Sequence, residues 1–117
     1  MRRDELLLRD ILQAADMISE FLDGIDRSRF LNDRLIQSAV LQQLTIIGEA
    51  ASRVSQTLRE DYPKVPWDDA RATRNFVVHQ YFSIDWWIVW DTATQNIPEI
   101  RPLIAAIIEA EVGDAPT

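Results

Sequence analysis

Residues 35–58 read LIQSAVLQQLTIIGEAASRVSQTL, and the spacing of their apolar side chains decides the fold. An apolar residue recurs every three or four positions, which is the pattern of a helix that buries one face. The members of this stripe are Leu35, Ile36, Ala39, Val40, Leu44, Ile47, Ala51, Val54 and Leu58. We predict one long helix here, with Asn32 as its N-cap, because an asparagine side chain can accept a hydrogen bond from a free backbone N–H one turn into the helix.

Gly48 lies in the middle of that helix, where glycine costs about 1 kcal/mol relative to alanine. Close approach by another helix is the usual compensation, so we expect a tight contact at Gly48. Glu49 and Arg53 stand four residues apart with the acid first, a spacing that forms an ion pair on a helix surface. Two interpretations stay open for this pair: a solvated surface pair, or part of a dimer surface or a functional site.

The flanking segments carry the same helical periodicity. Apolar residues recur at three and four positions from Leu7 to Ile25, and Gly24 is a plausible end of that first helix. Pro63 and Pro66 interrupt the pattern after the long helix. A third helix is predicted to begin at Trp67, where two acidic residues follow directly, and to run on into the polar stretch after residue 73.

Two further helices are predicted in the last third of the chain. Ser83 is the expected cap of a fourth helix, and Pro98 suits the first turn of a fifth. The tail after about residue 111 is expected to fray. The sequence of 117 residues therefore predicts a single domain, 1–117, that folds as an all-α antiparallel bundle of about five helices.

The chain has four tryptophans, and three of them fall within five residues at Trp86, Trp87 and Trp90. Consecutive helical residues differ by about 100° around the axis, so these three indoles span a wide arc. One bundle would not bury all of them. A face that associates with a second copy of the chain is therefore expected, which predicts a homodimer.

Composition limits the chemistry of the chain. It contains no cysteine and one histidine, so thiolate zinc sites and histidine clusters are excluded, and we expect no metal and no cofactor. The net charge of −7 argues against binding nucleic acid or anionic membrane over the whole surface. No apolar run approaches the roughly 20 residues that span a bilayer, and the N-terminus lacks a signal-peptide pattern. We therefore expect a cytoplasmic protein with no membrane partner.

The single histidine belongs to the stretch RNFVVHQY, residues 74–81. On an ideal helix Asn75 and His79 share a face, while Arg74 must reach around or serve a site where two chains meet. Imidazole can take the proton of a ribose 2′-hydroxyl near neutral pH, and a guanidinium can stabilise a phosphate transition state. Asn75 could fix the imidazole tautomer, and Tyr81 could orient a phosphate or stack on a base. Read from the residues alone, ordinary packing at a helix end is the favoured explanation of this cluster, and a functional site is the alternative.

The pattern Arg74-Asn75-x-x-x-His79-x-Tyr81 resembles the R-x-x-x-x-H-x-Y motif of HepT-like toxins in the HEPN superfamily. Three other segments are similar to the same family and follow in the expected order. They are IGEAASR at 47–53, YPKVPW at 62–67 and IVWDT at 88–92. The resemblance as a whole extends over roughly residues 5 to 105. Each segment alone is a weak signal, but four in register indicate kinship.

The resemblance implies an all-α, HEPN-like homodimer whose two motifs line a cleft at the interface. It also implies metal-independent ribonuclease activity, with Arg74 and His79 catalytic and Asn75 in support. A cognate MNT-type nucleotidyltransferase antitoxin is the implied partner, and it would transfer AMP onto Tyr81. Phosphate charge and adenosine bulk beside the histidine would then repel and block an RNA backbone.

Two further positions bear on the motif. Arg71 lies outside the motif spacing and is a candidate RNA contact only. Gln80 stands where many relatives have glycine, and its larger side chain could narrow the turn that presents the tyrosine.

Two functions from different classes are therefore expected. The first is a toxin ribonuclease that acts on cellular RNA. The alternative is a noncatalytic helical binding subunit that docks onto a nucleotidyltransferase, which the acidic net charge favours. A helix-turn-helix DNA binder is disfavoured, because no predicted helix has the basic face that phosphate contacts require.

Overall fold

The computed structural model describes residues 2–78 and 83–113 of the chain. Within these ranges every regular element is helical and no strand occurs, which confirms the predicted all-α class. The helices are α1 (Arg2–Phe21), α2 (Arg27–Leu31), α3 (Arg34–Arg53), α4 (Gln56–Asp61), α5 (Trp67–Ala72), α6 (Asn75–Val78), α7 (Trp86–Asp91), the π-helix η2 (Thr92–Asn96) and α8 (Ile97–Val112).

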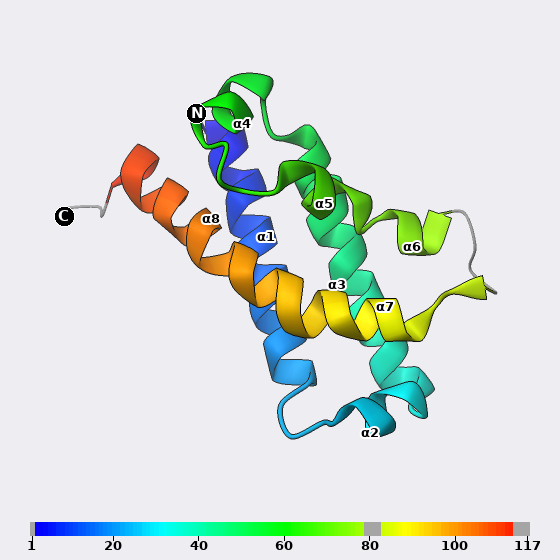
Figure 1. Ribbon diagram of the computed structural model, residues 1–117. Helices are drawn as coiled ribbons and strands as arrows, with labels where there is room; N and C mark the ends of the chain where they lie inside the picture. Colours follow the sequence, from blue (N-terminus) through cyan, green and yellow to red (C-terminus); the bar gives the residue numbers. More distant parts are fainter. Residues whose placement is uncertain (1, 79–82, 114–117) are drawn as a thin grey trace.

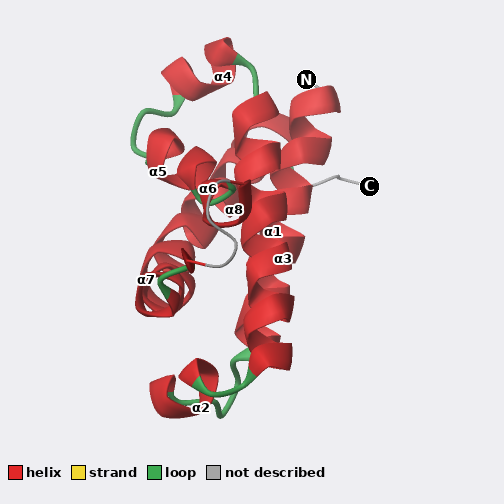
Figure 2. Ribbon diagram, turned by 90° about the vertical axis from the view of Figure 1, so that its right-hand side faces the viewer, coloured by secondary structure: helices red, strands yellow, loops and turns green. Residues whose placement is uncertain are grey.

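Two long antiparallel helices form the centre of the molecule. The chain runs along α1, turns through the short α2 and returns along α3, which packs beside α1 as predicted (Figure 1). The segments α7, η2 and α8 join into one rod that crosses this pair and packs α8 against α1. In Figure 2 this rod is seen close to end-on, with α5 and α6 between it and the top of α3. Arg74 and Asn75 thus lie where the start of α6 passes along α3.

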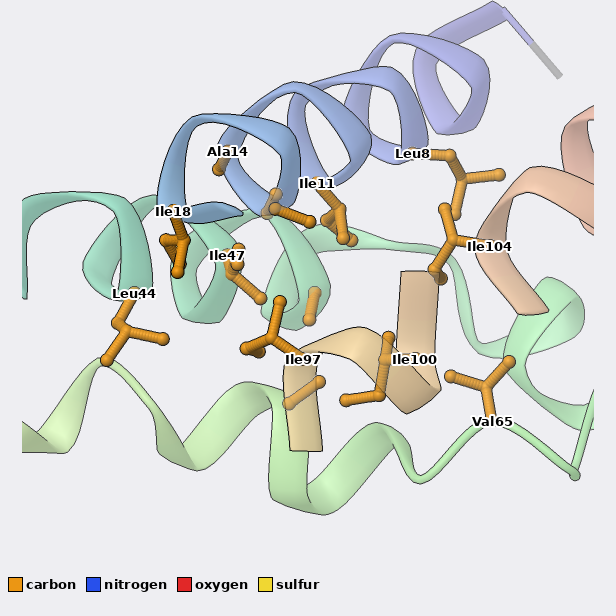
Figure 3. Close-up of a cluster of buried hydrophobic side chains, with 14 of the residues drawn as sticks. Leu8, Ile11, Ala14, Ile18, Leu44, Ile47, Val65, Ile97, Ile100 and Ile104 are labelled. Atoms are coloured by element: carbon orange, nitrogen blue, oxygen red, sulfur yellow. The ribbon is translucent and has the colours of Figure 1, made fainter. Parts of the chain in front are cut away.

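The core lies between the α1–α3 pair and the rod. Its side chains are almost all aliphatic, and Figure 3 shows α1, α3 and α8 each contributing to one cluster. Among the members at or below 3% exposure are Leu8, Ile11, Ile18, Leu44, Ile47, Ile97, Ile100 and Ile104. Burying one such side chain stabilises a fold by about 1.5–3 kcal/mol. Most of the stripe read from residues 35–58 points into the core, through α3 to its C-cap Val54 and then through Leu58 on α4, but Leu35 at its start is 80% exposed.

The start of α3 differs from the prediction by one residue. Asp33, not Asn32, is the N-cap, and its Oδ1 accepts a hydrogen bond from the backbone N–H of Ile36 at 3.1 Å. Asn32 instead ends α2, where its side chain donates to the carbonyl oxygen of Ser28. The sequence pattern did not predict the short α2, and Asn32 is the C-cap of that helix. Asp33 also places a negative charge at the positive end of the helix dipole.

The long helix ends earlier than predicted. It stops at Arg53, and Ser55 then caps the separate helix α4 by accepting from the backbone N–H of Leu58. The Asp4 carboxylate on α1 accepts hydrogen bonds from both the backbone N–H and the hydroxyl of Ser55, at 2.9 and 2.6 Å. A tertiary contact from α1 therefore fixes the break between α3 and α4.

The predicted fourth helix begins two residues later than expected. Asp85, not Ser83, is its cap, because the Asp85 Oδ1 accepts from the backbone N–H groups of Trp87 and Ile88 at 3.0 and 3.3 Å. A carboxylate satisfies two free donors here and complements the helix dipole, which a hydroxyl at residue 83 does not do.

The predicted fourth and fifth helices form one continuous rod. No turn separates them. Instead Thr92–Asn96 is a π-helix, in which the backbone N–H of Ile97 bonds to the carbonyl of Thr92 five residues back. Proline at 98 lacks an N–H, and its ring would clash with the carbonyl four residues before it in a regular α-helix. The wider turn absorbs that conflict, so Pro98 marks a bulge in a helix as well as the first turn of α8.

Glycines end two helices. Gly24 follows α1 with a φ of +73°, which confirms the predicted stop, since this left-handed conformation favours glycine. Gly113 has a φ of +77° after α8. The helix therefore continues to Val112, and the part of the predicted tail at residues 114–117 lies outside the described ranges.

The tryptophans divide between the core and the surface, as the arc predicted. Trp67 is buried, while Trp86 and Trp90 are half-buried against Phe30, with ring centroids 6.2 and 5.4 Å away. Trp87 is 53% exposed, and the guanidinium of Arg27 lies 4.6 Å from its ring centroid. One indole of the three on α7 is thus left on the outside of this fold.

Candidate functional site

The structure describes only part of the predicted site. Arg74 lies at the junction between α5 and α6, and Asn75 is the first residue of α6 with an exposed side chain. Arg71 lies on α5. His79 and Tyr81, together with Gln80 between them, lie outside the described residues, so the predictions for them stay predictions.

The third helix is not continuous through the motif. α5 ends at Ala72 and α6 begins at Asn75, so Thr73 and Arg74 form a junction between two short helices. The backbone there follows a tighter hydrogen-bond pattern, with the N–H of Thr73 bonded to the carbonyl of Ala70 and that of Phe76 to the carbonyl of Thr73. Thr73 is 4% exposed and Phe76 packs against the core.

Gly48 lets this junction press directly onto α3. A Cβ atom at Gly48 would lie 2.5 Å from the backbone nitrogen of Arg74, and 2.8 Å from both the Arg74 Cβ and the Thr73 Oγ1. No side chain fits at these separations without movement of the backbone. The predicted close approach at Gly48 is therefore confirmed, and the segment that approaches is the one that carries the motif arginine.

The Thr73 hydroxyl secures the same contact. Its Oγ1 lies 2.7 Å from the carbonyl oxygen of Leu44 on α3 and 2.8 Å from that of Ala70 on α5. These bonds are buried, where an unmade hydrogen bond costs about 1–3 kcal/mol. The backbone of Arg74 is thus held against α3 by the close approach at Gly48 and by the Thr73 hydroxyl beside it.

The Arg74 side chain lies along α3 and contacts two of its residues. Its NH1 is 3.3 Å from the Oγ of Ser52 and 3.8 Å from the Oε1 of Glu49. The other Glu49 oxygen lies 4.0 Å from the NH2 of Arg53. The guanidinium side chain remains 41% exposed. A guanidinium has five N–H donors, so contacts at NH1 leave others that could bind a phosphate oxygen.

The structure shows Glu49 and Arg53 as a surface ion pair, and it also shows a contact from Glu49 to Arg74. Both side chains of the Glu49–Arg53 pair are exposed and their N–O distance of 4.0 Å is long, as expected of a solvated i,i+4 ion pair. Glu49 also contacts Arg74, which places it at the candidate site. Sequence reasoning missed the link from Glu49 and Ser52 to Arg74, because residues 22 and 25 positions away in the chain meet only through the fold. The available signal was that 49, 52 and 53 share one helix face beside Gly48.

Arg71 has a different neighbour. Its NH1 lies 3.3 Å from the Oδ1 of Asp68 one turn earlier on α5, and its side chain is 40% exposed. A phosphate at Arg71 would compete with that carboxylate. The structure therefore places Arg71 and Arg74 on different partners.

Two further properties of the described residues bear on function. No group of three or more His, Cys, Asp or Glu side chains in residues 2–78 and 83–113 is arranged to hold a metal ion. No helix in those ranges has the length and apolar composition to cross a membrane.

Comparison with known proteins gives a consistent family. The family model described as ribonuclease HepT-like matches residues 11–107. "Putative RNase MJ1380" of Methanocaldococcus jannaschii is 38% identical over 101 residues, which is 86% of this chain and 93% of that protein. "Probable ribonuclease HepT" of Thermococcus cleftensis is 34% identical over 94 residues, or 80% and 86% of the two chains. "Putative RNase TTE0752" of Caldanaerobacter subterraneus is 32% identical over 111 residues, or 95% and 99%. No solved structure matches the chain.

Proposed function

The chain belongs to the HepT-like ribonuclease family, and from that premise we propose that it is a toxin endoribonuclease that cleaves cellular RNA without a metal ion. The observation that carries the proposal is the fixed position of Arg74, whose backbone is held against Gly48 while its guanidinium stays accessible. A side chain that binds a phosphate in a transition state needs both a fixed backbone and a guanidinium that the substrate can reach.

The proposed reaction uses the ribose 2′-hydroxyl as its nucleophile. The His79 imidazole takes the hydroxyl proton, and the 2′ oxygen attacks the adjacent phosphorus. The bond from phosphorus to the 5′ oxygen breaks, and that oxygen takes a proton from solvent. The products are a 2′,3′-cyclic phosphate and a 5′-hydroxyl. Arg74 stabilises the additional negative charge on the phosphorus oxygens, and Asn75 supports the histidine tautomer.

The test is cleavage of total cellular RNA, including transfer RNA, by the purified protein. Cleavage that disappears in His79→Ala supports the nuclease. The second candidate, a noncatalytic subunit of a nucleotidyltransferase, is favoured by the net charge of −7, which repels RNA outside a local patch. Failure of the protein to cut any cellular RNA pool, or equal cutting by His79→Ala, would leave that second candidate.

A homodimer is the proposed assembly, with two motifs at a shared cleft. Its support is a pair of adjacent exposed apolar side chains on α7, Trp87 at 53% and Ile88 at 50%. Large apolar side chains gathered on a surface mark contact sites. Light scattering at micromolar concentration is expected to give twice the 13.5 kDa mass of one chain. A single-chain mass would contradict the dimer.

The proposed partner is an MNT-type nucleotidyltransferase that inactivates the toxin in the cytoplasm. The Tyr81 oxygen attacks the α-phosphorus of ATP, the bond to pyrophosphate breaks, and the phenolic proton passes to solvent or a base on the partner. AMP then occupies the place beside His79 where an RNA phosphate would bind, and its charge repels that phosphate.

Intact mass of the protein co-expressed with this partner tests the transfer. We expect the wild type to gain the mass of one adenylyl group and Tyr81→Phe to gain none. The chain has two tyrosines, so Tyr62→Phe is the matched control and is expected to keep the addition. The Tyr62 hydroxyl donates to the Glu111 carboxylate, which raises the pKa of Tyr62. If Tyr62→Phe loses the addition and Tyr81→Phe keeps it, then Tyr62 is the modified residue and the proposal for Tyr81 is wrong.

A further inference from the structure

We propose that Glu49 is a positioning residue that orients the Arg74 guanidinium for the phosphate and that acts on the reaction only through Arg74. This inference rests on the proposed ribonuclease function. Three neighbouring positions of α3 meet the same arginine: Gly48 meets its backbone, while Glu49 and Ser52 meet its NH1 at 3.8 and 3.3 Å.

The Ser52 hydroxyl is oriented to accept from Arg74. Its Oγ donates to the carbonyl oxygen of Glu49 at 2.8 Å, so its one proton is already used. A lone pair is then available to the guanidinium. NH1 therefore faces a neutral acceptor and a carboxylate on the same side, and both come from one turn of α3. These two acceptors fix the end of the guanidinium that points back to the protein.

The contact with Glu49 is suited to orientation and contributes little to folding. The Glu49 side chain is 46% exposed and the Arg74 side chain 41%, and exposed ion pairs add little net stability because solvent and ions screen them. Glu49 is also shared with Arg53, at 4.0 Å. An exchangeable carboxylate of this kind can hold the arginine in the free protein without closing it to a phosphate.

Glu49 has opposite effects on RNA binding and on catalysis, and this separates it from a structural residue. A carboxylate next to the phosphate site repels RNA, so its removal strengthens ground-state binding or leaves it unchanged. Removal also frees the guanidinium to rotate, which weakens its contact with the transition state. Loss of folded protein would lower the apparent kcat and leave KM unchanged, so the folded fraction is measured as well. A fall in KM together with the fall in kcat is the result that lost folding does not produce.

Glu49→Ala is the variant that tests the inference. We expect kcat to fall about tenfold, because a misplaced group in the site can cost up to about 100-fold, while KM for RNA stays the same or falls. The matched control is Glu5→Ala, which removes the acid of another i,i+4 pair, Glu5 with Arg9 at 2.9 Å on α1, and changes the net charge equally. Glu5→Ala is expected to keep the wild-type kcat.

A double-mutant cycle then asks whether Glu49 acts through Arg74. Single-turnover rates are measured for wild type, Glu49→Ala, Arg74→Ala and the double variant, with unfolding temperature as a check on folding. We expect Glu49→Ala to have no further effect once Arg74 is alanine. Effects that multiply, or a Glu49→Ala kcat equal to that of Glu5→Ala, would overturn the inference.

The same experiment separates the inference from the proposed function. If Arg74→Ala loses cleavage and Glu49→Ala keeps it, the ribonuclease proposal stands and only the role of Glu49 is wrong. If the wild type does not cleave RNA, or Arg74→Ala cleaves as fast as the wild type, the proposed function fails and the inference falls with it.

Discussion

Arg74→Ala is expected to lower the rate of RNA cleavage by about 10²–10³-fold, the loss usually seen when one donor to a transition-state oxyanion is removed. Arg74 lies at the junction between α5 and α6, and its guanidinium is partly exposed there. His79→Ala should have a loss of about 10²–10⁴-fold, as for other general bases. Cleavage of a labelled RNA by excess enzyme measures both rates without a contribution from product release.

Two other arginine variants test whether shape or charge is responsible. Arg74→Lys keeps the charge but loses the planar fork, so it should recover only part of the rate. Arg101→Ala is the charge-matched control, because Arg101 on α8 is bound by the Asp16 carboxylate of α1 at 2.7 and 3.3 Å, and this pair lowers the pKa of Asp16. Its kcat should equal the wild-type value. Wild-type cleavage by Arg74→Ala would contradict the assigned role.

Gly48→Ala is expected to destabilise the protein by about 1–3 kcal/mol, as overpacking of a tight contact does. The new methyl group would lie 2.5 Å from the backbone nitrogen of Arg74, so the junction has to move away from α3. That movement displaces the arginine, and cleavage should fall together with stability. Urea unfolding and single-turnover cleavage measure the two effects on the same sample.

The control for Gly48→Ala uses an exposed position of the same helix. Gln42 is exposed on α3, and the variants Gln42→Gly and Gln42→Ala differ by the same methyl group. There the alanine variant should be more stable by about 1 kcal/mol, from helix propensity alone. The sign of the glycine-to-alanine step is therefore opposite at the two positions. A more stable Gly48→Ala protein would show that the contact at Gly48 is not tight.

The sequence predicted the long elements well, because their signals are local and repeated. The stripes of α1 and α3 and the stop at Gly24 are all seen. The caps at Asn32 and Ser83 were wrong by one and two residues, since an acid stood close by in each case and its carboxylate accepts from the first free backbone N–H groups of the helix. The short helices α2 and α6 have five and four residues, too few for their own propensity to specify them.

The sequence predicted only those features of the candidate site that depend on spacing along the chain. The motif spacing indicated Arg74 and Asn75, and the glycine at 48 indicated a close approach. What approached could not be read from spacing, because the contacts of Thr73 with Leu44 and of Arg74 with Ser52 span 29 and 22 residues. The roles of His79 and Tyr81 rest on the family resemblance and remain predictions.

The π-helix in the rod has a geometric consequence for α7. One extra residue inside a helix shifts the azimuth of everything before it by about 100° relative to everything after it. With η2 present, Val89 is fully buried while Trp87 faces outward. Without that rotation about the helix axis, a different face of α7 would pack against the rest of the protein. One surplus residue near Pro98 therefore determines which face of α7, and with it Trp87, is left on the outside of the fold.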